Sequence, residues 1–160
     1  MKQFLVCVLA ASALAGCATM STESPGMGGP KEARMAFDIT DTATQPLIVK
    51  LETIETTRKQ LIEAGYTPKI VLAFRGNASY FTQTDLTLVK EGDRADALKI
   101  RSLIKQLRQA NGIVGMDQCN IPLAPRKIKS QDLMQEVKLV PNGWIALAEY
   151  QRQGYAYIAP

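Results

Sequence analysis

Cys119 is the side chain in this sequence best suited to covalent chemistry. Residues 112–121 read Gly-Ile-Val-Gly-Met-Asp-Gln-Cys-Asn-Ile, and we predict a short buried strand, residues 113–116, followed by a polar loop that carries the thiol. The chain contains no histidine. Ser-His-Asp triads, Cys-His dyads, HExxH helices and His-ligated metal sites are therefore excluded, and no CxxC pair is present. Thiol chemistry, carboxylate chemistry and plain binding remain.

A second set of polar residues follows another apolar run: Arg75, Gly76, Asn77 and, slightly later, Tyr80. A guanidinium near Cys119 would raise its thiolate fraction, and the amide and phenol could donate hydrogen bonds to an anion. Each residue also has a simpler interpretation. Arg75 can be a surface ion-pair partner, and a single cysteine is often only a small buried side chain. Both interpretations stay open at this stage.

Composition and length indicate one globular α/β domain. The chain has 160 residues, of which 46% are apolar and 21% are charged. The formal net charge is +4, and the basic residues are spread along the chain except for a small run at residues 126–129. We interpret that run as a solvated loop and predict no nucleic-acid partner. No metal and no cofactor are predicted.

The N-terminus has the pattern of an export signal. A short basic start precedes an apolar run at residues 4–14, which is too short to span a bilayer as a stable helix. Leu14-Ala15-Gly16-Cys17 then resembles the bacterial lipoprotein box. That resemblance implies cleavage before Cys17 and attachment of lipid, including palmitate, to its thiol. The alternative is an ordinary secretory signal with a chance cysteine.

We therefore divide the chain into a signal peptide (1–16), a lipidated cysteine with a flexible tether (17–31) and a folded domain (32–160). The tether is rich in Ala, Thr, Ser, Pro, Gly and Met and lacks periodicity. Ala18 stands where an aspartate would favour inner-membrane retention. The expected location is thus the outer membrane, with the domain facing the periplasm.

Within the domain, the first helix has the clearest pattern. Leu47, Leu51, Ile54 and Leu61 recur at helical spacing, and Gly65 supplies a left-handed end. We expect hydroxyl and carboxylate side chains in residues 40–44 to cap its start. Residues 78–89 fit either one helix or two short pieces. The other expected elements are strands at 34–39, 69–74, 137–140 and 155–158, helices at 94–110 and 144–153, and a helical turn at 130–134 capped by Ser130.

This alternation of strands and helices is typical of a doubly wound, mostly parallel sheet. Ligands bind such sheets beyond the carboxyl ends of the strands. Three polar segments, 38–44, 75–77 and 117–120, follow strands and are expected to meet at that edge. We expect Trp144 and Tyr157 to make core or subunit contacts.

Several segments together resemble the DsrE/DsrF-like (intracellular sulfur oxidation protein-like) family over residues 34–160. They are Phe74-Arg75-Gly76-Asn77-Ala78, the strand into Cys119, Val140-Pro141-Asn142-Gly143 and the closing Gly154-Tyr155-Ala156-Tyr157-Ile158. The resemblance implies a flavodoxin-like three-layer sandwich and assembly into homo- or hetero-oligomers. It also implies that a cysteine after a central strand, here Cys119, carries persulfide sulfur between partner proteins. Pro122 departs from the helix start that usually follows this cysteine.

Three functional hypotheses follow. In the first, a lipid-anchored DsrE-like protein binds or carries reactive sulfur on Cys119, with Arg75, Gly76, Asn77 and Tyr80 lining the site and a sulfur donor or acceptor as partner. In the second, the protein is a non-catalytic oligomeric module that binds a small ligand or serves as a scaffold. The third is a flavodoxin-type electron carrier. An exported lone thiol could also form an intermolecular disulfide.

Overall fold

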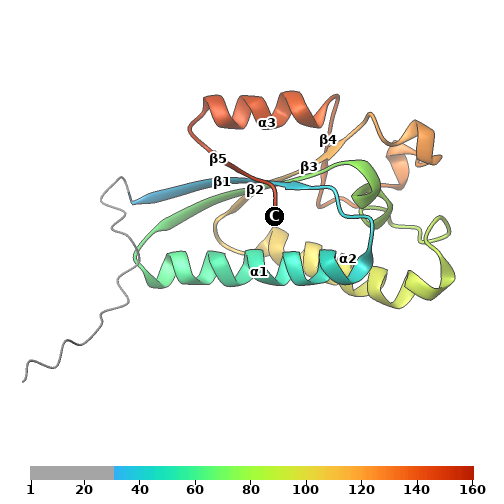
Figure 1. Cartoon of the computed structure of the whole chain (residues 1–160), viewed down its shortest axis with the longest axis horizontal. Coiled ribbons are helices and arrows are strands. Elements are labelled where there is room, and N and C mark those ends of the chain that lie inside the picture. The colour runs from blue at the N-terminus through green and yellow to red at the C-terminus, as the bar shows by residue number, and fades with distance from the viewer. Residues whose placement is uncertain (1–30) are drawn as a thin grey trace, which may run out of the picture.

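A computed structural model describes residues 31–160, which form a three-layer α/β sandwich (Figure 1). The predicted signal peptide, Cys17 and nearly all of the tether lie outside the described residues. The central sheet has five strands, all parallel, in the order β4-β3-β2-β1-β5. Their bounds are β1 Glu32–Ile39, β2 Thr67–Phe74, β3 Ile113–Cys119, β4 Lys138–Val140 and β5 Ala156–Ile158. The predicted flavodoxin-like architecture is confirmed.

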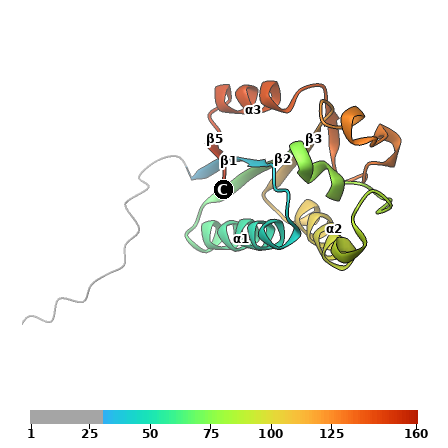
Figure 2. The same cartoon turned by 45° about the vertical axis from the view of Figure 1, so that its right-hand side comes forward.

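The helices divide unequally between the two faces of the sheet. Helices α1 (Thr44–Glu63) and α2 (Arg94–Gln109) cover one face, and α3 (Gly143–Arg152) covers the other (Figures 1 and 2). Because β4 and β5 lie at opposite edges, the chain between them must cross the whole sheet. Helix α3 makes that crossing and contacts β1, β2, β3 and β5.

The core is asymmetric because side-chain size differs between the faces. On the α1/α2 side, large residues such as Leu72, Phe74 and Ile104 are fully buried. On the α3 side, the buried apolar cluster consists of Ala36 and Ala73 with Leu147 of α3. Small side chains on that face let α3 lie close to the sheet. The same closeness brings its first turn against the strand ends.

Most predicted elements are present, but the predicted end of β3 is wrong. The strand continues to Cys119, so the thiol belongs to the last residue of the strand and not to a loop. The polar character of Asp117 and Gln118 predicts a loop, yet both residues are buried. Hydrogen-bond partners from other elements make that burial possible.

Two predicted helix caps are also wrong. Ala43 holds the N-cap position of α1 and makes no side-chain cap hydrogen bond. The hydroxyl of Thr44 donates instead to Asp96 at 2.7 Å, which ties α1 to α2. Ser130 opens a short 3₁₀ helix, Ser130–Asp132, whose N-cap is Lys129.

The ambiguous segment at residues 78–89 contains no α-helix. It begins within a 3₁₀ helix, Gly76–Phe81, and continues as irregular chain. In residues 31–160, no helix has both the length and the apolar character needed to cross a membrane.

Gly112 should be the least replaceable glycine of the fold. It has φ +96°, and an added Cβ would lie 2.5 Å from Pro68 Cγ and 3.1 Å from the Pro68 carbonyl oxygen. Gly112→Ala should therefore lower the free energy of unfolding by about 3 kcal/mol, from left-handed strain plus overpacking. Gly154→Ala is the matched control, because φ is +85° there but no atom lies within 4 Å. It should cost about 1 kcal/mol. Equal losses in urea unfolding followed by circular dichroism would contradict the steric argument.

Candidate functional site

The Cys119 sulfur lies at the start of helix α3. The thiol belongs to the last residue of β3, and its Sγ accepts a hydrogen bond from the backbone N–H of Gly143 at 3.1 Å. The first N–H groups of a helix have no partner inside the helix and carry partial positive charge. The positive end of this helix therefore lies against the Cys119 sulfur. The Cys119 side chain is only 4% exposed.

Asn142 and Gly143 determine where α3 begins. Asn142 is the N-cap residue, with extended backbone, and its side-chain oxygen accepts a hydrogen bond from the Trp144 N–H at 2.9 Å. A Cβ at Gly143 would lie 2.5 Å from Arg75 Cδ and 3.0 Å from Cys119 Cβ. Only glycine lets the helix begin in contact with both side chains.

Arg75 is held by a buried carboxylate. Its Nε and Nη2 donate to Asp38 at 2.8 and 2.5 Å, and the Tyr157 hydroxyl donates to the same carboxylate at 2.8 Å. The Asp38 hydrogen bonds raise the pKa of Arg75, burial opposes this shift, and nearby Tyr157 and Cys119 act in the same direction as Asp38. The guanidinium also lies 5.2 Å from the ring centroid of Trp144. Arg75 is thus both the ion-pair partner of Asp38 and a residue that contacts the start of α3 beside Cys119.

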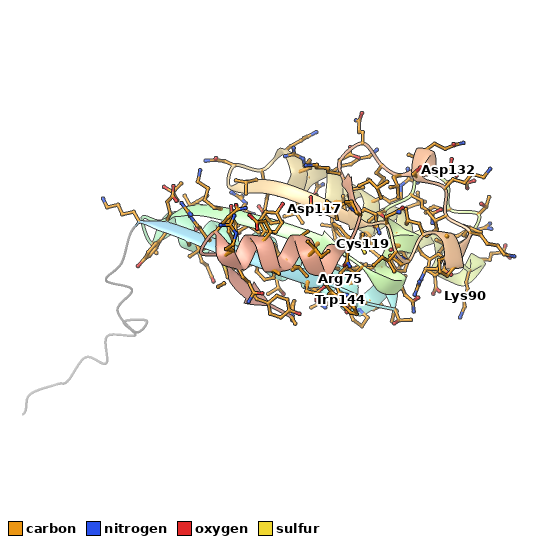
Figure 3. The ribbon with its side chains drawn as sticks, turned by 90° about the horizontal axis from the view of Figure 1, so that it is seen from above. Arg75, Lys90, Asp117, Cys119, Asp132 and Trp144 are labelled. Carbon is orange, nitrogen blue, oxygen red and sulfur yellow. The ribbon has the colours of Figure 1, made fainter. Side chains whose placement is uncertain are left out.

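These side chains surround a cavity of about 250 Å³, which we call the thiol cavity. Figure 3 shows Arg75, Cys119 and Trp144 together at one end of α3. Much of the remaining wall is apolar. The lining residues are Arg75, Gly76, Cys119, Ile121, Pro122, Pro125, Arg126, Asn142 and Trp144.

The structure brings only some of the predicted site residues to this cavity. Arg75, Gly76 and Cys119 line it, whereas Asn77 and Tyr80 line a neighbouring cavity of about 340 Å³. Asn77 still connects the two, because its side-chain oxygen accepts hydrogen bonds from Arg126 at 2.7 and 2.9 Å. Asn77 is therefore a support of the thiol cavity and not part of its lining.

Sequence reasoning missed Arg126, Asn142 and Gly143 as site residues. The sequence places Arg126 in a basic run interpreted as a solvated loop, and it singles out Asn142 and Gly143 only as part of a segment that resembles the family. Of the core or subunit contacts expected for Trp144, the core contact is wrong, since its side chain is 66% exposed at the rim of the cavity. A subunit contact stays a prediction. The Asn-Gly pair before a helix was the available signal for the missed residues.

A buried polar network fixes the backbone of Cys119. The Gln118 amide nitrogen donates to the Cys119 carbonyl oxygen and to the Ser79 hydroxyl, both at 2.8 Å. Its amide oxygen accepts from the Thr82 hydroxyl at 2.7 Å. A buried amide loses folding free energy for each N–H or oxygen that has no hydrogen-bond partner. This network therefore holds the end of β3 in one position.

Asp117 lies two residues before Cys119 on the same face of the sheet. Burial raises the pKa of its carboxyl group, while the hydrogen bond from the Tyr150 hydroxyl, at 2.9 Å, acts in the opposite direction. The pKa of Tyr150 is also raised, by burial and by the same carboxylate. Within residues 31–160, no group of three or more His, Cys, Asp or Glu side chains is placed to hold a metal ion.

The chain resembles known proteins over most of its length. The model of the DsrE/DsrF-like family matches residues 24–160. An uncharacterized protein of Aquifex aeolicus (strain VF5) is 30% identical over 110 residues, which cover 69% of this chain and 48% of that protein. The chain thus spans about half the length of this relative.

A solved structure has the same fold. The protein of unknown function MTH1491 from Methanobacterium thermoautotrophicum superimposes with a TM-score of 0.57. The match covers 80% of this chain and 99% of that protein, at 18% sequence identity. At this identity the likeness concerns the fold alone.

Gly143→Ala should disturb the thiol cavity although alanine is the better helix former. The new methyl group would overlap the stem of Arg75, which cannot withdraw because Asp38 holds its guanidinium. We expect a loss of about 2 kcal/mol in the free energy of unfolding and a changed alkylation rate of Cys119. Gly92→Ala, where no atom lies within 4 Å, should change neither. A Gly143→Ala protein with native stability and native thiol reactivity would refute the close-contact argument.

Asp117 should give the protein a distinctive pH dependence. Because its folded-state pKa is raised, the folded state holds the proton more tightly than the unfolded state. This contribution is present below the ordinary aspartate pKa and is lost as pH rises through the raised pKa. The stability advantage of wild type over Asp117→Asn should therefore shrink steadily as the pH rises above the ordinary aspartate pKa of about 3.9. Tyr150→Phe should move that loss to higher pH, and a pH-independent difference in urea unfolding would contradict the assignment.

Proposed function

The chain belongs to the DsrE/DsrF-like family, and on that premise we propose that it carries sulfane sulfur as a persulfide on Cys119. One observation carries the proposal: the thiol lines a cavity while its sulfur accepts the first N–H of α3. This arrangement supports a negative sulfur and leaves room for a donor molecule. Arg75 lines the same cavity and keeps its charge through Asp38.

The carrier step is a sulfur transfer between thiols. The Cys119 thiolate attacks the terminal sulfur of a donor persulfide or polysulfide, and a new S–S bond forms. The S–S bond of the donor breaks, and its bonding pair leaves with the donor as a thiolate. A second thiol can take the terminal sulfur from Cys119 in the same way, so no outside oxidant or reductant is required.

The protein would perform this task at the cell envelope. The Leu14-Ala15-Gly16-Cys17 box supports a lipid anchor on Cys17, and Ala18 supports the outer membrane with the domain facing the periplasm. The sulfur donor or acceptor would then be a protein or small molecule of that compartment. Assembly as a homo-oligomer is part of the same proposal.

A non-catalytic small-ligand-binding or scaffold module is the second candidate function. The observation that favours it is the 4% exposure of Cys119, which is typical of a packing cysteine. In that case the cavity would bind a ligand without forming a bond to sulfur. The two functions differ in whether the folded protein can react at Cys119.

The test is the intact mass of the full-length chain in which Cys7→Ser and Cys17→Ser leave Cys119 as the single thiol. After exposure to inorganic polysulfide, the protein should gain the mass of sulfur, and a reductant should remove it. Cys119→Ser in the same background is the control and should gain nothing. If the single-thiol chain gains no sulfur and its Cys119 also resists iodoacetamide until the chain is unfolded, the carrier function is wrong and the binding module stands.

A further inference from the structure

We propose that the thiol cavity is an anion site in which Arg126 selects the donor. The donor class is a sulfane sulfur bonded to an oxyanion, either thiosulfate or a small organic thiosulfonate. The inference rests on the proposed function, because Cys119 must accept the sulfur. It goes beyond that function by naming the donor and the residue that recognises it.

Arg126 is the cavity residue whose charge is not matched by a carboxylate. It donates to neutral oxygens, the Asn77 side chain at 2.7 and 2.9 Å and the Pro122 carbonyl at 3.3 Å. None of the ion pairs formed within residues 31–160 includes it. The other guanidinium, Arg75, is matched by Asp38. The lining thus carries one uncompensated positive charge and no carboxylate.

The geometry holds the Arg126 guanidinium at the cavity and leaves some of its N–H groups free to bind an oxyanion. Two N–H groups of Arg126 converge on one oxygen of Asn77, which holds the half-buried guanidinium in place. A guanidinium has five N–H groups in a planar fork, so others remain for a bound oxyanion. A partly desolvated charge gains most from an opposite charge beside it.

The rest of the lining explains why the anion should be a compact sulfur compound. Ile121, Pro122, Pro125 and Trp144 present apolar surface, which suits the polarisable sulfur end of the donor, while Arg126 binds its oxyanion end. The 250 Å³ volume leaves space for a small organic group beside the oxyanion. Methanethiosulfonate is thus the organic example of this donor class, and thiosulfate is the inorganic one.

The transfer step balances without a further reagent. The Cys119 thiolate attacks the outer sulfur of thiosulfate, and an S–S bond forms. The S–S bond of thiosulfate breaks, and its electron pair leaves with sulfite, or with methanesulfinate when the donor is methanethiosulfonate. Arg126 faces the oxyanion as it gains this negative charge, which should lower the barrier to transfer.

A pair of alkylating reagents tests the anion site apart from sulfur chemistry. Iodoacetate and iodoacetamide react with thiols by the same displacement but differ in charge. In the single-thiol chain, the iodoacetate-to-iodoacetamide rate ratio at Cys119, divided by the ratio in the unfolded chain, should exceed one. Arg126→Gln should lower it about tenfold, as expected for the loss of one nearby charge. Arg126→Lys should retain part of it, and Lys129→Gln, which removes an exposed charge from the same basic run, should not change it.

Sulfur loading is the second readout. The single-thiol chain should gain one sulfur from thiosulfate, from methanethiosulfonate or from both, and Arg126→Gln should load at least about tenfold more slowly. Loading by methanethiosulfonate alone would assign the organic source, and loading by thiosulfate the inorganic one. An unchanged rate ratio in Arg126→Gln, or loading by polysulfide but by neither oxyanion, overturns this inference and leaves the carrier function intact. If neither the sulfur donors nor the alkylating reagents react with Cys119 in the folded chain, both this inference and the carrier function are overturned.

Discussion

The contact between the first turn of α3 and the end of β3 is the constraint on which the site depends. It exists because Gly143 has no side chain, so that the backbone N–H reaches the Cys119 sulfur at 3.1 Å. The small residues Ala36 and Ala73 beneath α3 let the helix lie low enough for this contact. The crossover from β4 to β5 then determines which helix end meets the thiol. In this chain the helix N-terminus at the cysteine comes from the segment after β4 and not from the segment after β3.

The charged groups of the α3 face form a chain from the edge strand to the thiol cavity. Tyr157 of β5 donates to Asp38 of β1, Asp38 holds Arg75, and Arg75 lies over Trp144. Burying an ion pair costs desolvation energy, which such multiple hydrogen bonds offset. The closing Gly-Tyr-Ala-Tyr-Ile segment thereby supports the site from the far edge of the sheet. This explains physically why residues near the end of the chain belong to the same structural unit as Cys119.

The sequence predicted the parts of this fold that depend on local pattern. Helical spacing from Leu47 to Leu61 located α1, and the apolar run before Arg75 located β2. The end of β3 could not be predicted, because Asp117 and Gln118 are buried through partners such as Tyr150, Ser79 and Thr82. Arg126 looked like a solvated charge for the same reason: its partner Asn77 lies 49 positions earlier. The sequence predicted that the strand ends meet at one edge, because this follows from a parallel sheet. It could not predict the role of each side chain there, because that role depends on tertiary contacts.

The burial of Cys119 bears on whether its thiol can form a disulfide with another copy of the chain. Oxidising compartments convert accessible thiols to disulfides, and a disulfide needs Cα atoms within about 7 Å of each other. Cys119 is 4% exposed and lines the same cavity as Arg75 and Trp144. In a pair of identical chains both Cys119 thiols are buried in this way, so the two cannot easily approach each other that closely. A donor small enough to enter a 250 Å³ cavity meets no such barrier. Burial of the thiol is therefore compatible with sulfur transfer, and it argues against an intermolecular disulfide.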